Sequence, residues 1–200
     1  MTDERKYYSS NFWYNEINSH VFNQDVNEYG KEYYVYKIYD EIITKIRDVP
    51  KDGYIVVLGT NRCVSFELLC KHFGHERCIG FDIDNPTKNP RVKVMDCSLL
   101  SVEHNIPISF VHNDLGSFPL TPKLKLHAQL WAAKNVVDGG FFLSRNNLNS
   151  AKYDLEGVMA EHGFINTQFE SLSSFIDISN LDSKTIEGHM ISKKINRILY

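Results

Sequence analysis

The segment Tyr54-Ile-Val-Val-Leu-Gly-Thr-Asn-Arg-Cys-Val-Ser-Phe-Glu-Leu-Leu69 decides the expected fold. An apolar run ends at Gly59, passes through a short polar turn, and continues into an amphipathic stretch. A second apolar run, Cys78-Ile-Gly-Phe-Asp82, follows and ends in a carboxylate. A strand, a tight turn, a helix and a strand with an acidic tip form the nucleotide-binding half of a Rossmann-like sheet. We therefore expect an α/β protein whose ligand lies at this turn.

Length and charge narrow the class of protein. A chain of 200 residues fits one domain with a full core. The net charge of −3 gives no general basic footprint, so we expect no nucleic-acid partner. The N-terminal Met-Thr-Asp-Glu-Arg-Lys lacks the apolar core of a signal peptide, and no apolar run approaches a membrane span. We expect a cytoplasmic protein that does not bind membranes; its oligomeric state is left open.

The cysteines show no metal-binding pattern along the sequence. Cys63, Cys70, Cys78 and Cys97 include no C-x-x-C pair, and the eight histidines form no ligand pair with them. We expect reduced thiols, and the spacing predicts no zinc site.

The chain divides into two parts. Residues 1–30 are polar and aromatic, and we expect an N-terminal extension that packs over the sheet or helix ends or forms a lid over a ligand. Residues 31–200 are expected to form the Rossmann-like domain, beginning with a helix over 31–47. Further helices are predicted at 65–73, from 121 to the glycines 139–140, and at 151–162. The predicted strands are 54–58, 78–82, 92–95, 106–112, 141–143, 164–169 and 188–193. This alternation implies a mainly parallel, doubly wound sheet.

The turn resembles a known cofactor motif. Leu58-Gly-Thr-Asn-Arg-Cys-Val-Ser resembles the first motif of class I S-adenosylmethionine-dependent methyltransferases, and most closely the branch with a Gly-Thr-x-x-Gly-x-Ser turn. That branch includes macrocin-type O-methyltransferases and cephalosporin-hydroxylase-like proteins. The resemblance covers about residues 31–200. It implies a seven-stranded sheet in the order 3-2-1-4-5-7-6, with an antiparallel last strand, and S-adenosylmethionine as cofactor.

The motif is degenerate at three positions. Val57 replaces an acidic residue that in the family helps to organise the methionyl amino group. Asn61 and Cys63 stand where the family has further glycines. Asparagine tolerates left-handed backbone geometry, whereas the side chain of Cys63 would crowd the methionine part of the cofactor. These departures support an alternative in which the fold is kept as a non-catalytic binding or interaction module.

The resemblance assigns cofactor contacts to the turn and to two strand ends. In the turn these are Gly59, Thr60, Asn61 and Cys63. Asp82 would accept hydrogen bonds from both hydroxyls of a ribose. Asp84 is a rival, but Asp82 is preferred because it falls at the strand end itself. The alternative without a ligand is a loop aspartate that only caps local N–H groups.

A second acidic strand end is expected at the adenine. By the resemblance, Asp96 would accept from the adenine amino group and the backbone N–H of Cys97 would reach the ring. Alternatively, Asp96 caps a helix that begins at Ser98.

The fourth strand leads into Phe110-Val-His-Asn-Asp-Leu-Gly116. Here His112 and Asp114 align with the first histidine and first aspartate of the branch pattern Ile-His-Ile-Asp-Gly-Asp-His. Either His112 takes a proton from a substrate hydroxyl, or Asp114 binds a metal that lowers the hydroxyl pKa. A packed strand residue is the alternative for His112. The stretch Ser144-Arg-Asn-Asn147 offers no carboxylate, so we expect no catalytic metal.

The preferred function is methyl transfer from S-adenosylmethionine to a small molecule, with a hydroxyl of a small molecule or sugar as the expected acceptor. The Asn-Pro-Pro-Tyr type of signature found in amino-methylating nucleic-acid enzymes is absent after the fourth strand. A nicotinamide-dependent oxidoreductase is disfavoured because the turn lacks the glycines of G-x-G-x-x-G.

Overall fold

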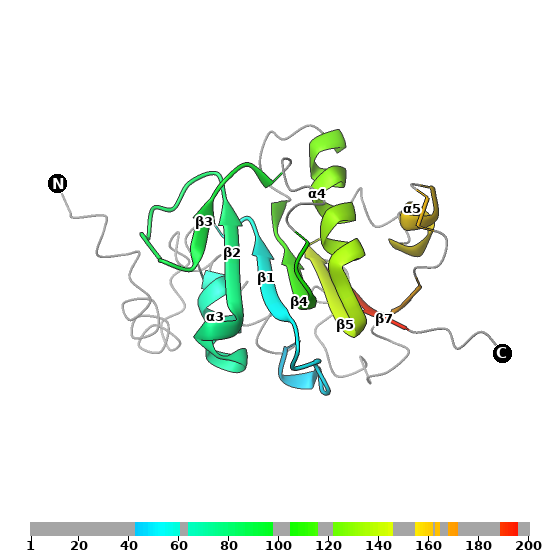
Figure 1. Ribbon diagram of the computed structural model, residues 1–200, viewed down its shortest axis with the longest axis horizontal. Helices are drawn as coiled ribbons and strands as arrows, with labels where there is room; N and C mark the ends of the chain where they lie inside the picture. The colour runs from blue at the N-terminus through cyan, green and yellow to red at the C-terminus, as the bar shows by residue number, and fades with distance from the viewer. Residues whose placement is uncertain are drawn as a thin grey trace, which may run out of the picture.

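A computed structural model shows a sheet of seven strands in the order β3-β2-β1-β4-β5-β7-β6 (Figure 1). The structure describes residues 43–60, 64–97, 105–115, 122–145, 155–161, 163–164, 168–171 and 189–195. The predicted extension at residues 1–30 and most of the predicted helix over 31–47 lie outside these ranges. None of the described helices is long and apolar enough to cross a membrane.

The strand directions match the expected topology. The strands are β1 (Tyr54–Leu58), β2 (Cys78–Asp82), β3 (Val92–Val94), β4 (Ile108–Asn113), β5 (Val136–Arg145), β6 (Phe169–Ser171) and β7 (His189–Lys194). From β3 to β5 every pairing is parallel, and β7 runs antiparallel to both β5 and β6. The predicted doubly wound sheet and its strand order are confirmed.

Burial explains why the apolar runs become central strands. Residues Ile55–Leu58 of β1 are fully buried. A parallel strand covered on both faces reads as a continuous apolar run, which is the pattern of the opening segment.

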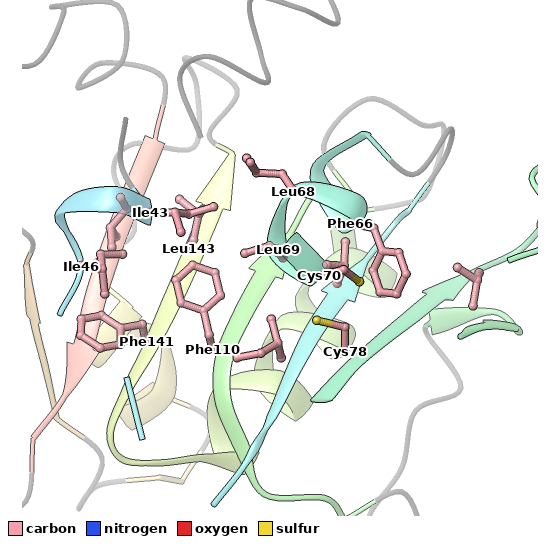
Figure 2. Packing of buried hydrophobic residues seen from close by; sticks show 14 residues of the cluster. Ile43, Ile46, Phe66, Leu68, Leu69, Cys70, Cys78, Phe110, Phe141 and Leu143 are labelled. Carbon is pink, nitrogen blue, oxygen red and sulfur yellow. The ribbon is translucent and has the colours of Figure 1, made fainter. Parts of the chain in front are cut away.

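Two apolar cores lie on opposite faces of the sheet, because successive side chains of a strand alternate in direction. On one face, α3 (Val64–Phe73) contacts β1 and β2, and its Phe66 and Leu69 belong to the same buried cluster as Phe110 and Phe141 (Figure 2). On the other face, α4 (Pro122–Asn135) contacts β4 and β5.

The prediction that the helix after residue 121 ends at the glycines 139–140 is wrong. The helix α4 ends at Asn135, and β5 begins at Val136 and includes both glycines. The pairing of β4 with β5 jumps from Ile108–Val136 to Phe110–Phe141, so the intervening residues form an irregularity within the strand. Gly139 has φ 77°, and a Cβ on Gly140 would lie 3.0 Å from the Ser109 carbonyl oxygen. Gly139 allows the left-handed backbone of the irregularity, and Gly140 allows the backbone of β5 to approach that of β4 at Ser109 closely.

The prediction of a strand over 164–169 is wrong at its start: Phe164 and Gln168 lie outside any strand, β6 is Phe169–Ser171, and residues 165–167 lie outside the described ranges. The reason is the end of α5 (Leu155–Glu161). The N–H of Phe164 donates to the Met159 carbonyl at 2.9 Å, and that of Gly163 donates to the Ala160 carbonyl at 3.0 Å. With Gly163 at φ 88°, this is a Schellman closure, which engages Phe164 in ending the helix.

Arg77 ties the entry of β1 to the start of β2. Its Nη2 donates to the Pro50 carbonyl at 2.6 Å and to the Gly53 carbonyl at 2.9 Å.

We expect Arg77→Ala to lower the free energy of unfolding by about 2–3 kcal/mol in urea denaturation, because charged hydrogen bonds are lost and two carbonyls lose a donor. Arg91, which is exposed and makes a 3.3 Å bond to the Glu76 carbonyl, is the control: Arg91→Ala should cost at most about 0.5 kcal/mol. Equal losses would contradict this role for Arg77.

Candidate functional site

The candidate site lies where β1, β2 and β4 end side by side in the sheet. Leu58 pairs with Phe81 of β2 and with Asn113 of β4, so the residues that follow these strands share one edge. Ligands of open α/β sheets bind at this carboxyl edge.

Gly59 makes the turn after β1. Its φ of 79° lies in the left-handed region, which suits glycine. Its N–H donates to the Phe81 carbonyl at 2.8 Å, which joins the turn to β2. A Cβ at this position would lie 3.0 Å from the Asp114 carbonyl oxygen. Gly59 therefore stands between the end of β2 and the residue that follows β4.

Thr60 and Asp82 are joined across the edge. The Thr60 hydroxyl donates to Asp82 Oδ2 at 3.3 Å, and Thr60 is only 3% exposed. Gly80 makes room for this threonine, because a Cβ there would lie 2.4 Å from Thr60 Cγ2. The half-buried Asp82 carboxylate is thus held in one orientation at the tip of β2.

The structure separates Asp82 from its rival Asp84. Asp82 is the last residue of β2, as predicted. Asp84 is exposed, and its Oδ1 accepts from the Asn85 N–H at 2.7 Å while its own N–H donates to Asp82 Oδ1 at 3.3 Å. Asp84 therefore caps the loop that follows the strand.

The predicted adenine pair lies against the same strand end. The Met95 N–H donates to the Asp82 carbonyl at 2.7 Å, which places the half-buried Asp96 and the buried Cys97 directly after this link. The Cys97 thiol donates to the Phe81 carbonyl at 3.6 Å. Burial, followed by the negative charge of Asp82, raises the pKa of this thiol to about 12. The thiol is therefore neutral near pH 7 and unsuited to act as a nucleophile.

The two residues predicted to act on an acceptor lie in different environments. The Asp114 N–H donates to the Leu58 carbonyl at 2.9 Å, and the residue is half-buried beside Gly59. His112 lies inside β4, paired in register with Val57 and Leu143, and is fully buried.

Asn113 and Ser144 form a buried polar pair that sequence reasoning missed. Asn113 Nδ2 donates to Ser144 Oγ at 3.1 Å, and each residue is 3% exposed. Among the described residues, no group donates to the buried Oδ1 of Asn113. The sequence does show a polar residue near the end of each of these two strands. That the two residues pair depends on the β4–β5 register, which the sequence does not give.

Exposed apolar side chains flank Asp82 as well. Ile83 is 70% exposed, and Val94, which pairs with Asp82 in the β2–β3 register, is 62% exposed. An apolar residue directly after an acidic strand tip is a signal that the sequence offered. The predicted contacts Asn61 and Cys63, and the loop residues 146–147, lie outside the described ranges.

Comparison with known proteins identifies the fold. The sequence matches no protein-family model and no curated protein. The structure matches a TehB-like SAM-dependent methyltransferase from Corynebacterium glutamicum with a TM-score of 0.53 at 14% identity, covering 94% of this chain and 98% of that one. It also matches a chain of the complex between the Haloferax volcanii Trm112 methyltransferase activator and a methyltransferase (TM-score 0.52, 13% identity, coverage 90% and 97%). The chain has the S-adenosylmethionine-dependent methyltransferase fold.

Other structures with the methyltransferase fold vary in length. The sugar N-methyltransferase KedS8 from Streptoalloteichus matches with a TM-score of 0.50 at 8% identity, covering 92% of this chain and 93% of that one. The chain spans 63% of the length of a methyltransferase from Clostridium acetobutylicum and 65% of that of Streptomyces venezuelae DesVI. The closer resemblance to the macrocin branch stays a prediction.

Proposed function

We propose that this protein is a methyltransferase that uses S-adenosylmethionine. The observation that carries the proposal is the position of Gly59. Its N–H bonds to the end of β2, and its α-carbon packs against Asp114 after β4. The turn thus has an acidic strand tip on one side and the backbone of a second acidic residue on the other, at the sheet edge where ligands of open α/β sheets bind.

The cofactor would extend from Gly59 towards β3. Asp82, oriented by Thr60, would accept from the ribose hydroxyls. Asp96 and the backbone N–H of Cys97 would meet the adenine edge, and the exposed side chain of Ile83 would cover part of its apolar face. Asn61 and Cys63 complete the proposed cofactor set from the turn.

The acceptor would lie above the end of β4, beside Asp114. The sulfonium of the cofactor already activates the methyl group, so in-line placement of the acceptor supplies much of the acceleration. We propose that the acceptor is a hydroxyl of a small molecule or sugar, and that Asp114, with His112 as the second candidate, takes its proton. Asp114 is half-buried at the sheet edge, which supports its role as the group that takes the proton. His112 is fully buried and would act from within β4. The N-terminal aromatic residues are proposed to cover this pocket in a cytoplasmic enzyme.

A non-catalytic binding module is the second candidate. One observation favours it: Val57, at the position of a family acid, is fully buried among apolar side chains. The site therefore lacks one carboxylate for the methionyl amino group. Cofactor binding without turnover on any acceptor would support the module.

Asp82→Ala tests the cofactor assignment. Loss of charge-assisted bonds to the ribose, worth about 1.5–3 kcal/mol, should weaken S-adenosylmethionine binding roughly 10- to 150-fold in calorimetry. Asp84→Ala is the matched control, because Asp84 caps the loop; its affinity should stay within about twofold of wild type. Equal affinities for wild type and Asp82→Ala would exclude Asp82 from the ribose site.

Methyl transfer should persist in the presence of a chelator. The stretch Ser144–Asn147 supplies no carboxylate, so Asp114 alone cannot build a tight magnesium or calcium site. Turnover measured with and without EDTA should agree within about twofold. Activity that EDTA abolishes and magnesium restores would contradict this expectation and favour a metal-dependent mechanism.

A further inference from the structure

A second group of chemically reactive side chains lies on the flank of α3. Glu67 and Cys70 are separated by one helical turn, and His75 begins the short helix η2 (His75–Arg77). One carboxylate oxygen, the Cys70 Sγ and one imidazole nitrogen all lie within 4.8 Å of one another. Gly74, with φ 92°, makes the turn that precedes His75.

The carboxylate of this cluster is oriented by a neighbouring loop. Asn89 Nδ2 donates to Glu67 Oε1 at 2.7 Å. Asn89 is itself fixed, because its N–H donates to Asn85 Oδ1 at 3.1 Å and its carbonyl accepts from Asn85 Nδ2 at 2.8 Å. The loop between β2 and β3 thus supplies an outer partner that holds a ligand carboxylate, as at metal sites in proteins.

Burial makes the cluster unusual for a solvated surface. Cys70 is 1% exposed, Glu67 is half-buried and His75 is exposed. Burial raises the pKa of Glu67, while the charge of His75 and the hydrogen bond from Asn89 act in the opposite direction. A nearby cation would compensate a carboxylate that is partly removed from water.

We propose that Glu67, Cys70 and His75 bind one zinc ion. Thiolate, imidazole and carboxylate are the zinc ligands found in proteins. In a tetrahedral site with bonds of about 2.0–2.3 Å, ligand atoms lie roughly 3.3–3.8 Å apart, so the three atoms would have to draw closer around the ion, through rotation of the half-buried Glu67 and the exposed His75 side chains. Three protein ligands leave the fourth position to water. The ion would join α3 to the turn before β2 and, through Asn89, to the β2–β3 loop.

This site could not be predicted from the sequence, because the spacing of its three ligands along the chain fits no usual zinc-binding motif. The ligands follow one another at intervals of three and five residues, and the second interval crosses Gly74. The expectation of no zinc site rested on spacing alone. The turn at Gly74 supplies the proximity that spacing did not indicate.

Zinc binding to the full chain, measured by competition with a chromophoric chelator, tests the proposal. Wild type should bind one equivalent. His75→Ala, which changes an exposed side chain, should weaken binding more than 100-fold, and Asn89→Ala should weaken it about 10- to 100-fold. His72→Ala is the control, an exposed histidine at the end of the same helix, and it should bind as wild type does. With Co²⁺ in place of zinc, a thiolate charge-transfer band should appear in wild type and be lost in Cys70→Ser.

Two results would overturn the proposal: no zinc bound by the wild type at micromolar concentration, or undiminished binding by His75→Ala. Because replacement of the buried Cys70 also perturbs the core, His75→Ala decides, with circular dichroism to show that its fold is intact. These readouts do not involve S-adenosylmethionine, so they are independent of the proposed methyl transfer.

Discussion

Gly59→Ala is expected to weaken S-adenosylmethionine binding more than 100-fold and to lower the free energy of unfolding by about 1–3 kcal/mol. An alanine at φ 79° is strained, and its Cβ would lie 3.0 Å from the backbone oxygen of Asp114. That oxygen belongs to the main chain and cannot move aside as the tip of a flexible side chain would. The strain should therefore displace the turn and break the hydrogen bond from the N–H of residue 59 to the Phe81 carbonyl at the end of β2. Calorimetry and urea denaturation measure the two effects.

Gly163→Ala provides the matched control. Gly163 has φ 88°, but a Cβ there would meet nothing within 4 Å, and the residue ends α5 away from the candidate site. It should lose about 1 kcal/mol of stability and keep wild-type cofactor affinity. If Gly59→Ala bound the cofactor as tightly as Gly163→Ala, the turn would have no part in the cofactor site.

Asp114→Asn should lower turnover about 10²- to 10⁴-fold while cofactor affinity stays within a few-fold of wild type. The substitution keeps the size of the side chain and removes its charge. Asp114 follows β4, on the far side of Gly59 from Asp82, so we assign it to the acceptor. Steady-state kinetics with an identified acceptor and calorimetry with the cofactor separate the two quantities. Asp138→Asn, an exposed aspartate within the β5 irregularity, should leave both unchanged.

The outcomes distinguish the possible roles. A smaller loss in Asp114→Asn, together with wild-type turnover in His112→Ala, would mean that positioning of the acceptor suffices. Loss of cofactor binding in Asp114→Asn would contradict its assignment to the acceptor. Absence of turnover on any acceptor, with cofactor affinity unchanged by either substitution, would favour the binding module.

The central strands could be predicted because their signals are local. The bounds of β1 and β2 follow from apolar runs that end at Gly59 and at Asp82. The glycines 139–140 were misread because a glycine pair marks a helix end or a strand irregularity equally well. Only the pairing of β4 with β5, set by distant residues, selects the second.

In the candidate site too, the residues with a local sequence signal could be predicted, and those that depend on strand register could not. The motif placed Gly59 and Asp82 correctly at the strand ends, whose proximity follows from a parallel sheet. The Asn113–Ser144 pair was not predicted, since it requires the register of two strands far apart in sequence. The convergence of Cys70 and His75 likewise depends on the backbone turn at Gly74, which residue spacing does not encode.

Titration of the wild-type chain with S-adenosylhomocysteine in a calorimeter tests the cofactor assignment most directly. The product shares the ribose, adenine and amino-acid groups of the cofactor but lacks the reactive methyl, so binding is measured without turnover. We expect a single site with a dissociation constant in the micromolar range, about −8 kcal/mol. No heat of binding at millimolar ligand would contradict the assignment of Gly59, Thr60, Asp82, Asp96 and Cys97 to a cofactor site.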